Sequence, residues 1–301
     1  MLLQQLVNGI VLGCVYALIA VGYTLVYGVI ELINFAHGDI YMLGAFFMYT
    51  FLNFGVPFLP SFVLAVICCI IVGILLDIIA YRPVRYADRL AALITAIGMS
   101  IFFENIALLI WGADIKRYSR EWIPHFFKKL FINLPNEHFQ NVFLTVSYLQ
   151  ITIIVLSIIL MIILHLIIHK TKMGTAMRAI AQDKRAAALM GIDVNRVISF
   201  TFALGSGLAA VAGIFIGMYY NSIYPMMGYI AGIKAFAAAV LGGIGSVPGA
   251  MLGGVVLGMA ETLGAGYISS AYRHGIAYAA MIFVILFNPA GLMGKRKVDK
   301  V

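Results

Sequence analysis

The chain has 301 residues, of which 63% are hydrophobic and only 11% are charged, and its formal net charge is +8. Its mean hydropathy of +1.03 lies far above the range of soluble domains, so the composition excludes a soluble globular protein. The chain belongs in a lipid bilayer.

Most of the sequence consists of apolar runs, which we expect to be helices, because backbone polar groups in lipid must be paired within their own segment. The runs predict an all-α, polytopic transmembrane helical bundle with about seven or eight membrane segments. No room remains for a soluble domain, so residues 1–301 are expected to form a single transmembrane domain. The apolar runs are residues 6–30, 40–54, 58–80, 91–111, 148–168, 197–219, 229–265 and 271–288.

A polar interruption separates the first two apolar runs. It contains Asn34, His37, Gly38 and Asp39, and it predicts a break between helices that exposes helix ends to a translocation pathway. A histidine and an aspartate two residues apart are also compatible with a metal or acid–base site. Nothing else in the sequence completes such a site, so we predict no catalytic residue and no metal site.

The distribution of lysine and arginine predicts the orientation, because these residues gather on the cytoplasmic side of a membrane protein. Basic residues cluster in 81–90, in 169–196 and in the tail after 294, and we place all three inside. The 112–147 segment is then an external loop, although its own basic residues weaken the contrast. The C-terminus is predicted to be cytoplasmic.

The basic segment 169–196 has its own helical pattern. Met173, Ala176, Met177 and Ile180 recur at helical spacing and predict a short amphipathic helix. Asp183 is placed to cap a second short helix, Gly191 to end it, and Asp193 to cap the following membrane span. This pair of helices could lie on anionic lipid, or it could insert a small apolar face, led by Ala187 with Leu189 and Met190, into a partner protein.

The run 229–265 is divided by a glycine-rich stretch. With the C-terminus inside, this run must begin and end on the outer side, and its two arms of about 14 to 16 residues are short for full spans. We therefore favour a re-entrant or broken helical hairpin, with two short tilted spans as the alternative. The interrupting residues are Gly242, Gly243, Gly245 and Pro248.

Charged residues inside apolar runs are costly and therefore mark a pair or a cavity. Glu104 is expected either to form a helix-packing hydrogen bond or to line the pathway. Lys234 and Glu261 lie at comparable distances from the glycine turn and are expected to pair. Asp77 is interpreted as structural, within reach of water or Arg82.

Three stretches together carry a resemblance to a known family. They are Leu-Ile-Asn-Phe-Ala-His-Gly-Asp (32–39), Gly-Thr-Ala-Met-Arg-Ala-Ile-Ala-Gln-Asp (174–183) followed by Ala-Ala-Leu-Met-Gly-Ile (187–192), and Lys-Ala-Phe-Ala-Ala-Ala-Val-Leu-Gly-Gly-Ile-Gly-Ser-Val-Pro-Gly-Ala (234–250). The chain resembles the permease subunits of branched-chain amino-acid ABC importers, closest to the shorter of the two permeases.

The resemblance implies that 169–196 is a cytoplasmic coupling region that docks onto a separate ATPase subunit. Many ABC importers have Glu-Ala-Ala-x-x-x-Gly at this place, whereas this chain has Arg185 in the position of the glutamate. The contact of that side chain is therefore in doubt, but the docking helix is not. The implied coupling residues are Met177, Asp183, Arg185, Ala186, Ala187, Leu189, Met190 and Gly191.

The resemblance also implies partners and a location. The partners are a second homologous permease, two ATP-binding subunits and an external or periplasmic substrate-binding protein, all at the bacterial cytoplasmic membrane and without nucleic acid. The chain has no Gly-x-x-x-x-Gly-Lys-[Ser/Thr] phosphate loop, so ATP and Mg are expected on the partner subunits and no cofactor on this chain.

Other functions compete with the import of branched-chain amino acids. Permeases of closely similar sequence are associated with urea or short amides, and specificity in such systems resides largely in the binding protein. An ATP-independent channel or carrier would need no docking helix, and an intramembrane enzyme would need a complete catalytic site.

Overall fold

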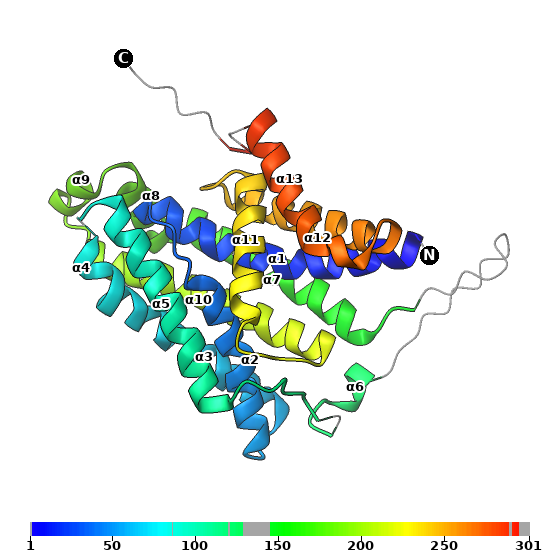
Figure 1. Cartoon of the computed structure of the whole chain (residues 1–301). Coiled ribbons are helices and arrows are strands. Elements are labelled where there is room, and N and C mark those ends of the chain that lie inside the picture. Colours follow the sequence, from blue (N-terminus) through cyan, green and yellow to red (C-terminus); the bar gives the residue numbers. More distant parts are fainter. Residues whose placement is uncertain (1, 86, 120, 129–144, 289–290, 295–301) are drawn as a thin grey trace.

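The computed structural model describes residues 2–85, 87–119, 121–128, 145–288 and 291–294, and it confirms the predicted helical bundle (Figure 1). Among these described residues, six helices or continuous helical stretches are long and apolar enough to cross a membrane: Leu2–Ile30, Phe58–Val84, Leu90–Trp111, Tyr148–Lys170, Val194–Tyr220 and Val247–Tyr267. The elements are α1 (Leu2–Ile30), α2 (His37–Asn53), α3 (Phe58–Leu76), a π-helical stretch η1 (Asp77–Tyr81), α4 (Arg82–Val84), α5 (Arg89–Trp111), α6 (His125–Lys128), α7 (Tyr148–Lys170), α8 (Lys172–Gln182), α9 (Lys184–Leu189), α10 (Val194–Tyr220), α11 (Met227–Gly242), α12 (Val247–Tyr267), a 3₁₀ turn η2 (Ser270–Tyr272) and α13 (Arg273–Phe287).

The most extensive helix contact in the bundle is that of the antiparallel pair α1 and α12, which lie side by side in Figure 1. Glycines bring the two backbones into contact: a Cβ atom added to Gly13 would lie 2.7 Å from Val255 Cα, and one added to Gly258 would collide with the backbone of Gly13. Small residues allow such close approach in membranes, where van der Waals packing rather than water exclusion drives helix association. The pair therefore fits only without side chains at these positions.

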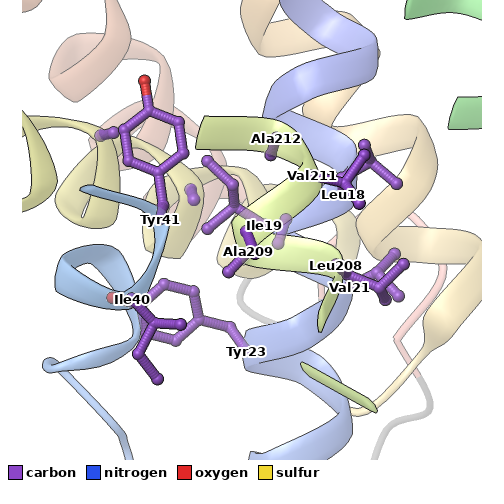
Figure 2. Packing of buried hydrophobic residues seen from close by; sticks show 14 of the residues in the cluster. Leu18, Ile19, Val21, Tyr23, Ile40, Tyr41, Leu208, Ala209, Val211 and Ala212 are labelled. Atoms are coloured by element: carbon purple, nitrogen blue, oxygen red, sulfur yellow. The ribbon is translucent and has the colours of Figure 1, made fainter. Parts of the chain in front are cut away.

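Helices α2 and α10 complete the core beside α1. Figure 2 shows buried side chains of α1, α2 and α10, among them Ile19, Tyr41 and Ala209, gathered between the three helices. The outer helices are much less buried. In an apolar 18-residue stretch of each helix, only 22% is buried in α5 and in α7, against 94% in α1. Their exposed isoleucine and leucine side chains suit lipid or a neighbouring membrane subunit.

The chain connections place two opposite ends on the bundle. At the basic end, Lys184 Nζ donates to Ile30 O at the end of α1 (2.9 Å), and Arg85 donates to Asn195 Oδ1 (2.7 Å). At the loop end, the N–H of Thr145 donates to Gln4 Oε1 near the start of α1 (2.9 Å), and Lys116 pairs with Ile223. The described parts of the 112–147 loop thus lie opposite the 169–196 segment, while residues 129–144 and 295–301 lie outside the described residues.

The predicted hairpin has unequal arms, which corrects the expectation of two arms of similar length. Helix α11 has 16 residues, whereas α12 has 21 and is long enough to span a membrane on its own. The turn between them has Gly243 and Gly245 at φ of 102° and 93°, and it lies beside Gly28 at the basic end, with Gly245 exposed. Of the two arms of the hairpin, only α11 is shorter than a usual membrane span.

The break after α1 is also displaced from its predicted place. Residues 31–36 are irregular, with Asn34 among them, but His37, Gly38 and Asp39 form the first turn of α2. Gly242 and Pro248 are likewise helical, at the end of α11 and at the start of α12. Glycine and proline tolerate helix termini, so their presence predicted the region of each break but not its limits.

Candidate functional site

Helix α8 lies at the basic end with its apolar face covered by its own chain. Met177 and Ile180 are buried, as their helical spacing predicts, and the helix packs against α7, α1 and α10. The Thr171 side chain caps it by accepting from the N–H of Gly174 (3.1 Å), and Arg178 donates to Ile168 O in the last turn of α7. A cation on unpaired carbonyls at a helix C-terminus is favourable, so α8 is fixed to the end of a membrane span.

Helix α9 begins and ends as the sequence predicts. Asp183 Oδ1 accepts from the N–H groups of Arg185 (2.7 Å) and Ala186 (3.0 Å), and these bonds, led by that of Ala186, hold the pKa of this carboxyl below its usual range. Gly191 has φ of 82° directly after the helix, and Asp193 caps α10 by accepting from the N–H of Arg196 (3.1 Å). Helix α9 is thus an ordered element with defined limits.

The apolar residues of α9 divide into a buried and an exposed set. Leu189 and Met190 are 89% and 83% exposed, and Arg185, Ala186 and Gly191 are also exposed. Ala187 is buried within the chain, as is Met177 of α8 with 2% exposure, so neither side chain can belong to a surface that meets a partner. We name Arg185, Ala186, Leu189, Met190 and Gly191 the coupling face.

At the start of α2, buried polar groups have no hydrogen-bond partner within the part of the chain that the structure describes. The His37 ring packs against Tyr23 (4.9 Å between ring centroids), close to Gly22 and Gly205, where no Cβ atom stands in its way. Among the described residues, His37 Nε2, both carboxylate oxygens of Asp39 and the Tyr23 hydroxyl have no hydrogen-bond partner. Asn34 accepts from the Tyr81 hydroxyl (2.9 Å) and is therefore tied to η1 instead.

Glu104 lies next to this group and lines a cavity of about 370 Å³ between α1, α5 and α11. Tyr23, Ser100 and Tyr229 also line it, and Ser100 and Glu104 are near Asp39. The sequence left two roles open for Glu104, a helix-packing hydrogen bond or a place in the wall of the pathway. Glu104 Oε1 has no hydrogen-bond partner among the described residues, so this oxygen does not form the packing bond. Polar groups of this kind within apolar helices favour the other alternative, a polar pathway.

The predicted pairing of Lys234 with Glu261 is confirmed, with 2.7 Å between Nζ and Oε1, and both side chains are buried. Arg273, which the sequence interpretation did not include, also donates to Glu261 Oε1 (2.6 Å). Asp77 pairs with Arg85 (2.8 Å) rather than closely with Arg82 (3.9 Å), and it accepts from the Ser199 hydroxyl (2.6 Å). These residues join η1 to α10 and α11 to α12 and α13.

Within the described ranges, no group of three or more histidine, cysteine, aspartate or glutamate residues could hold a metal ion. The described part of the chain therefore presents the coupling face at one end and, within the bundle, a largely apolar cavity with Glu104 in its wall.

Comparison with known proteins gives a consistent result over the whole length. The sequence matches the family described as branched-chain amino acid transport system / permease component over residues 5–285. It is 42% identical to the high-affinity branched-chain amino acid transport system permease protein LivH of Escherichia coli (strain K12), covering 99% of this chain and 97% of that protein. It is 44% identical to permease protein BraD of Pseudomonas aeruginosa (99% and 98%) and 30% identical to a probable LivH of Methanocaldococcus jannaschii (95% and 91%).

Proposed function

Because the chain belongs to the branched-chain amino acid transport system permease family, we propose that it is the membrane-spanning permease subunit of an ABC importer for branched-chain amino acids. It forms the translocation pathway together with a second, homologous permease. Two separate ATPase subunits bind ATP and Mg and supply the energy, and an external binding protein delivers the amino acid. The protein is located in the bacterial cytoplasmic membrane.

The observation that carries this proposal is the exposure of Leu189 and Met190 on an ordered helix outside the membrane spans. Burying one such side chain fully is worth about 1.5–3 kcal/mol, so the two together can contribute substantially to docking. Arg178 and Lys184 fix the two short helices to the ends of α7 and α1. A docked ATPase subunit would therefore act on the membrane helices directly.

The orientation follows from the coupling face, because an ATPase subunit meets it in the cytoplasm. The basic end, with Arg82, Arg85 and the 169–196 segment, is then cytoplasmic, in agreement with the positive-inside rule. Residues 291–294 belong to this end, since Leu292 and Met293 donate to backbone oxygens of Leu241 and Gly242. The C-terminus is accordingly cytoplasmic in this proposal.

The pathway for the substrate passes the polar groups at the start of α2 and the cavity beside them. His37, Asp39 and Glu104 offer polar atoms to which no described residue is hydrogen-bonded, at a place where α1, α2, α5 and α11 meet. Such atoms are expensive in lipid and therefore fit a cavity that admits polar cargo. The exposed face of α5 is available to the second permease.

Transport by the reconstituted complex tests the proposal. Proteoliposomes should contain this chain, its permease partner and the ATPase subunits, with the coupling face toward the lumen. They should accumulate leucine, isoleucine or valine only when ATP is in the lumen and the binding protein is outside. Urea and acetamide should neither accumulate nor compete. Flux through the purified chain without ATPase subunits would instead identify a channel or carrier, and ATP-driven accumulation of urea would identify the other substrate class.

A further inference from the structure

A second cavity lies at the loop end of the bundle, away from the coupling face. It has a volume of about 340 Å³ and is enclosed by α1, α2, α10, α11, α12 and α13. Tyr220, the last residue of α10, and Ser222 line it, next to the pairing of Lys116 with Ile223 that marks this end. In the proposed orientation the cavity faces the external side, where a substrate arrives. Its size is within the range of about 300–1,000 Å³ that is usual for small-molecule sites.

Two cations share a single carboxylate at the wall of this cavity. Glu261 Oε1 accepts from Lys234 Nζ (2.7 Å) and from Arg273 Nε (2.6 Å), and Glu261 Oε2 accepts from the Tyr16 hydroxyl (2.9 Å). All four side chains line the cavity. One lysine would be enough to neutralise the glutamate, so the arginine leaves a net positive charge there. An ion pair with only a packing role needs no such excess.

The cations retain donors that no described residue uses. Lys234 donates to Glu261 and to the Tyr16 hydroxyl (3.2 Å), which leaves one of its three hydrogens. Arg273 donates through Nε to Glu261 and through Nη2 to the Tyr220 hydroxyl (2.6 Å), which leaves Nη1. The Arg273 side chain is 33% exposed and so can be reached from outside. Guanidinium and ammonium groups with free hydrogens are the usual protein partners of a carboxylate.

The remaining walls suit an aliphatic zwitterion. Leu12, Ile216, Met227 and Ile230 provide apolar surface for a branched side chain. The tyrosine hydroxyls of residues 41 and 224 line the same space and can accept a hydrogen bond from an ammonium group. An apolar pocket with a few convergent polar groups is the usual form of a small-molecule site.

We propose that this cavity is a binding site for a free hydrophobic amino acid, with its α-carboxylate on Arg273 and Lys234 and its side chain against the apolar wall. The inference rests on the proposed function, because it assigns an entry site to the substrate of the importer. The permease then recognises the carboxylate itself, in addition to any recognition by an external binding protein.

Protection of an introduced cysteine tests the site in the assembled transporter without binding protein or ATP. Cys14, Cys68 and Cys69 are replaced by alanine, and Ser222→Cys places a thiol in the cavity wall for a membrane-impermeant reagent. L-Leucine should slow labelling by the factor 1 + [L]/Kd, which is roughly tenfold at nine times Kd. Leucinamide, which lacks the carboxylate, should bind at least tenfold more weakly, so at the same concentration it should slow labelling by no more than about twofold.

Matched variants separate binding from folding. Asp114→Cys, exposed at the same end but outside the cavity, should label at an unchanged rate with leucine. Arg273→Gln should abolish the protection by leucine, and Arg273→Lys should restore part of it. The comparison of leucine with leucinamide does not depend on Arg273 variants, so it decides the matter even if those variants fail to assemble.

The outcomes distinguish this site from the proposed function. No protection by leucine, or equal protection by leucinamide, overturns the carboxylate site even when ATP-driven uptake of leucine is intact. If uptake fails while leucine still protects Ser222→Cys selectively, the importer function falls and the binding site stands.

Discussion

Helices α8 and α9 follow each other directly at the basic end, yet they use their apolar residues in opposite ways. Helix α8 turns Met177 and Ile180 into the bundle, whereas α9 leaves Leu189 and Met190 exposed. Helical spacing identifies the apolar residues in both helices, but it does not tell which of them the chain itself covers. A buried face fixes a helix to its own chain, whereas an exposed face leaves a helix available to another molecule. The proposed docking of an ATPase subunit needs both.

The largest effect that we expect is the loss of stability in Met177→Ala. The side chain is buried between α8 and the ends of the spans, so its truncation should destabilise the folded chain by about 2–5 kcal/mol. Thermal unfolding in detergent, followed by size-exclusion chromatography, measures the change. An unfolding temperature equal to that of the parent chain would show that α8 is not anchored through this residue.

Leu189→Ala should give the inverse result, with unchanged stability and weaker assembly. The side chain has little contact with its own chain, but at the centre of a docked interface its loss should cost about 2 kcal/mol, or roughly 30-fold in affinity for the ATPase subunits. Titration of the ATPase subunits onto the permease in nanodiscs measures this affinity, with Met177→Ala as the reference for a folding defect. Unaltered affinity, together with weaker binding to anionic vesicles, would favour the lipid-surface interpretation of this segment.

The smallest effect concerns the cap of α9. Because bonds from the N–H groups of Ala186 and Arg185 lower the pKa of Asp183 in the folded chain, the charged cap stabilises α9 fully above the unfolded value of about 3.9 and loses this contribution as the pH falls through the lower, folded pKa. Hydrogen exchange at these amides should therefore show protection that is constant from pH 7 to 5 and declines only below the unfolded value.

Two variants of the cap serve as its controls. Asp183→Ala should raise exchange in α9 at every pH and leave α8 unchanged, because the alanine cannot accept a bond from either amide. Asp183→Asn should keep the protection and remove its dependence on pH, since asparagine caps without titrating. Protection that declines between pH 7 and 5 would contradict the assigned role of the carboxylate.

Much of the fold could be predicted from the sequence, because length and apolar composition decide which segments can be helices in lipid. The limits of α5, α7 and α10 differ from the apolar runs by only a few polar residues at the ends. The unequal hairpin could not be predicted this way, since Pro248 and the glycines on both sides of the turn are compatible with several helix limits. Helix α12 packs along α1 through residues that are more than 200 positions away in the chain, a contact that no local sequence pattern shows.

The candidate site was predicted less completely than the fold. The caps Asp183 and Asp193 and the stop at Gly191 are local, and all three are confirmed by the structure. The anchoring by Arg178 and Lys184 was missed, because a basic side chain on a polar face gives no sign that it will reach a helix end in another segment. Arg273 was missed for a similar reason, although its place at the start of an apolar run was a signal that could have prompted a search for a carboxylate.

The glycine contact between α1 and α12 bears on how a movement at one end of the bundle would affect the other end. The two backbones are in contact at Gly13 and Gly258, so we expect the two helices to move together as one unit. At the basic end of this pair, Lys184 donates to Ile30 O of α1. Toward the other end, Glu261 of α12 binds Lys234 at the wall of the cavity. With 29 residues, α1 is about 43 Å long, so if the two helices move as one unit, we expect a displacement at α9 to shift the wall of the cavity at the loop end as well.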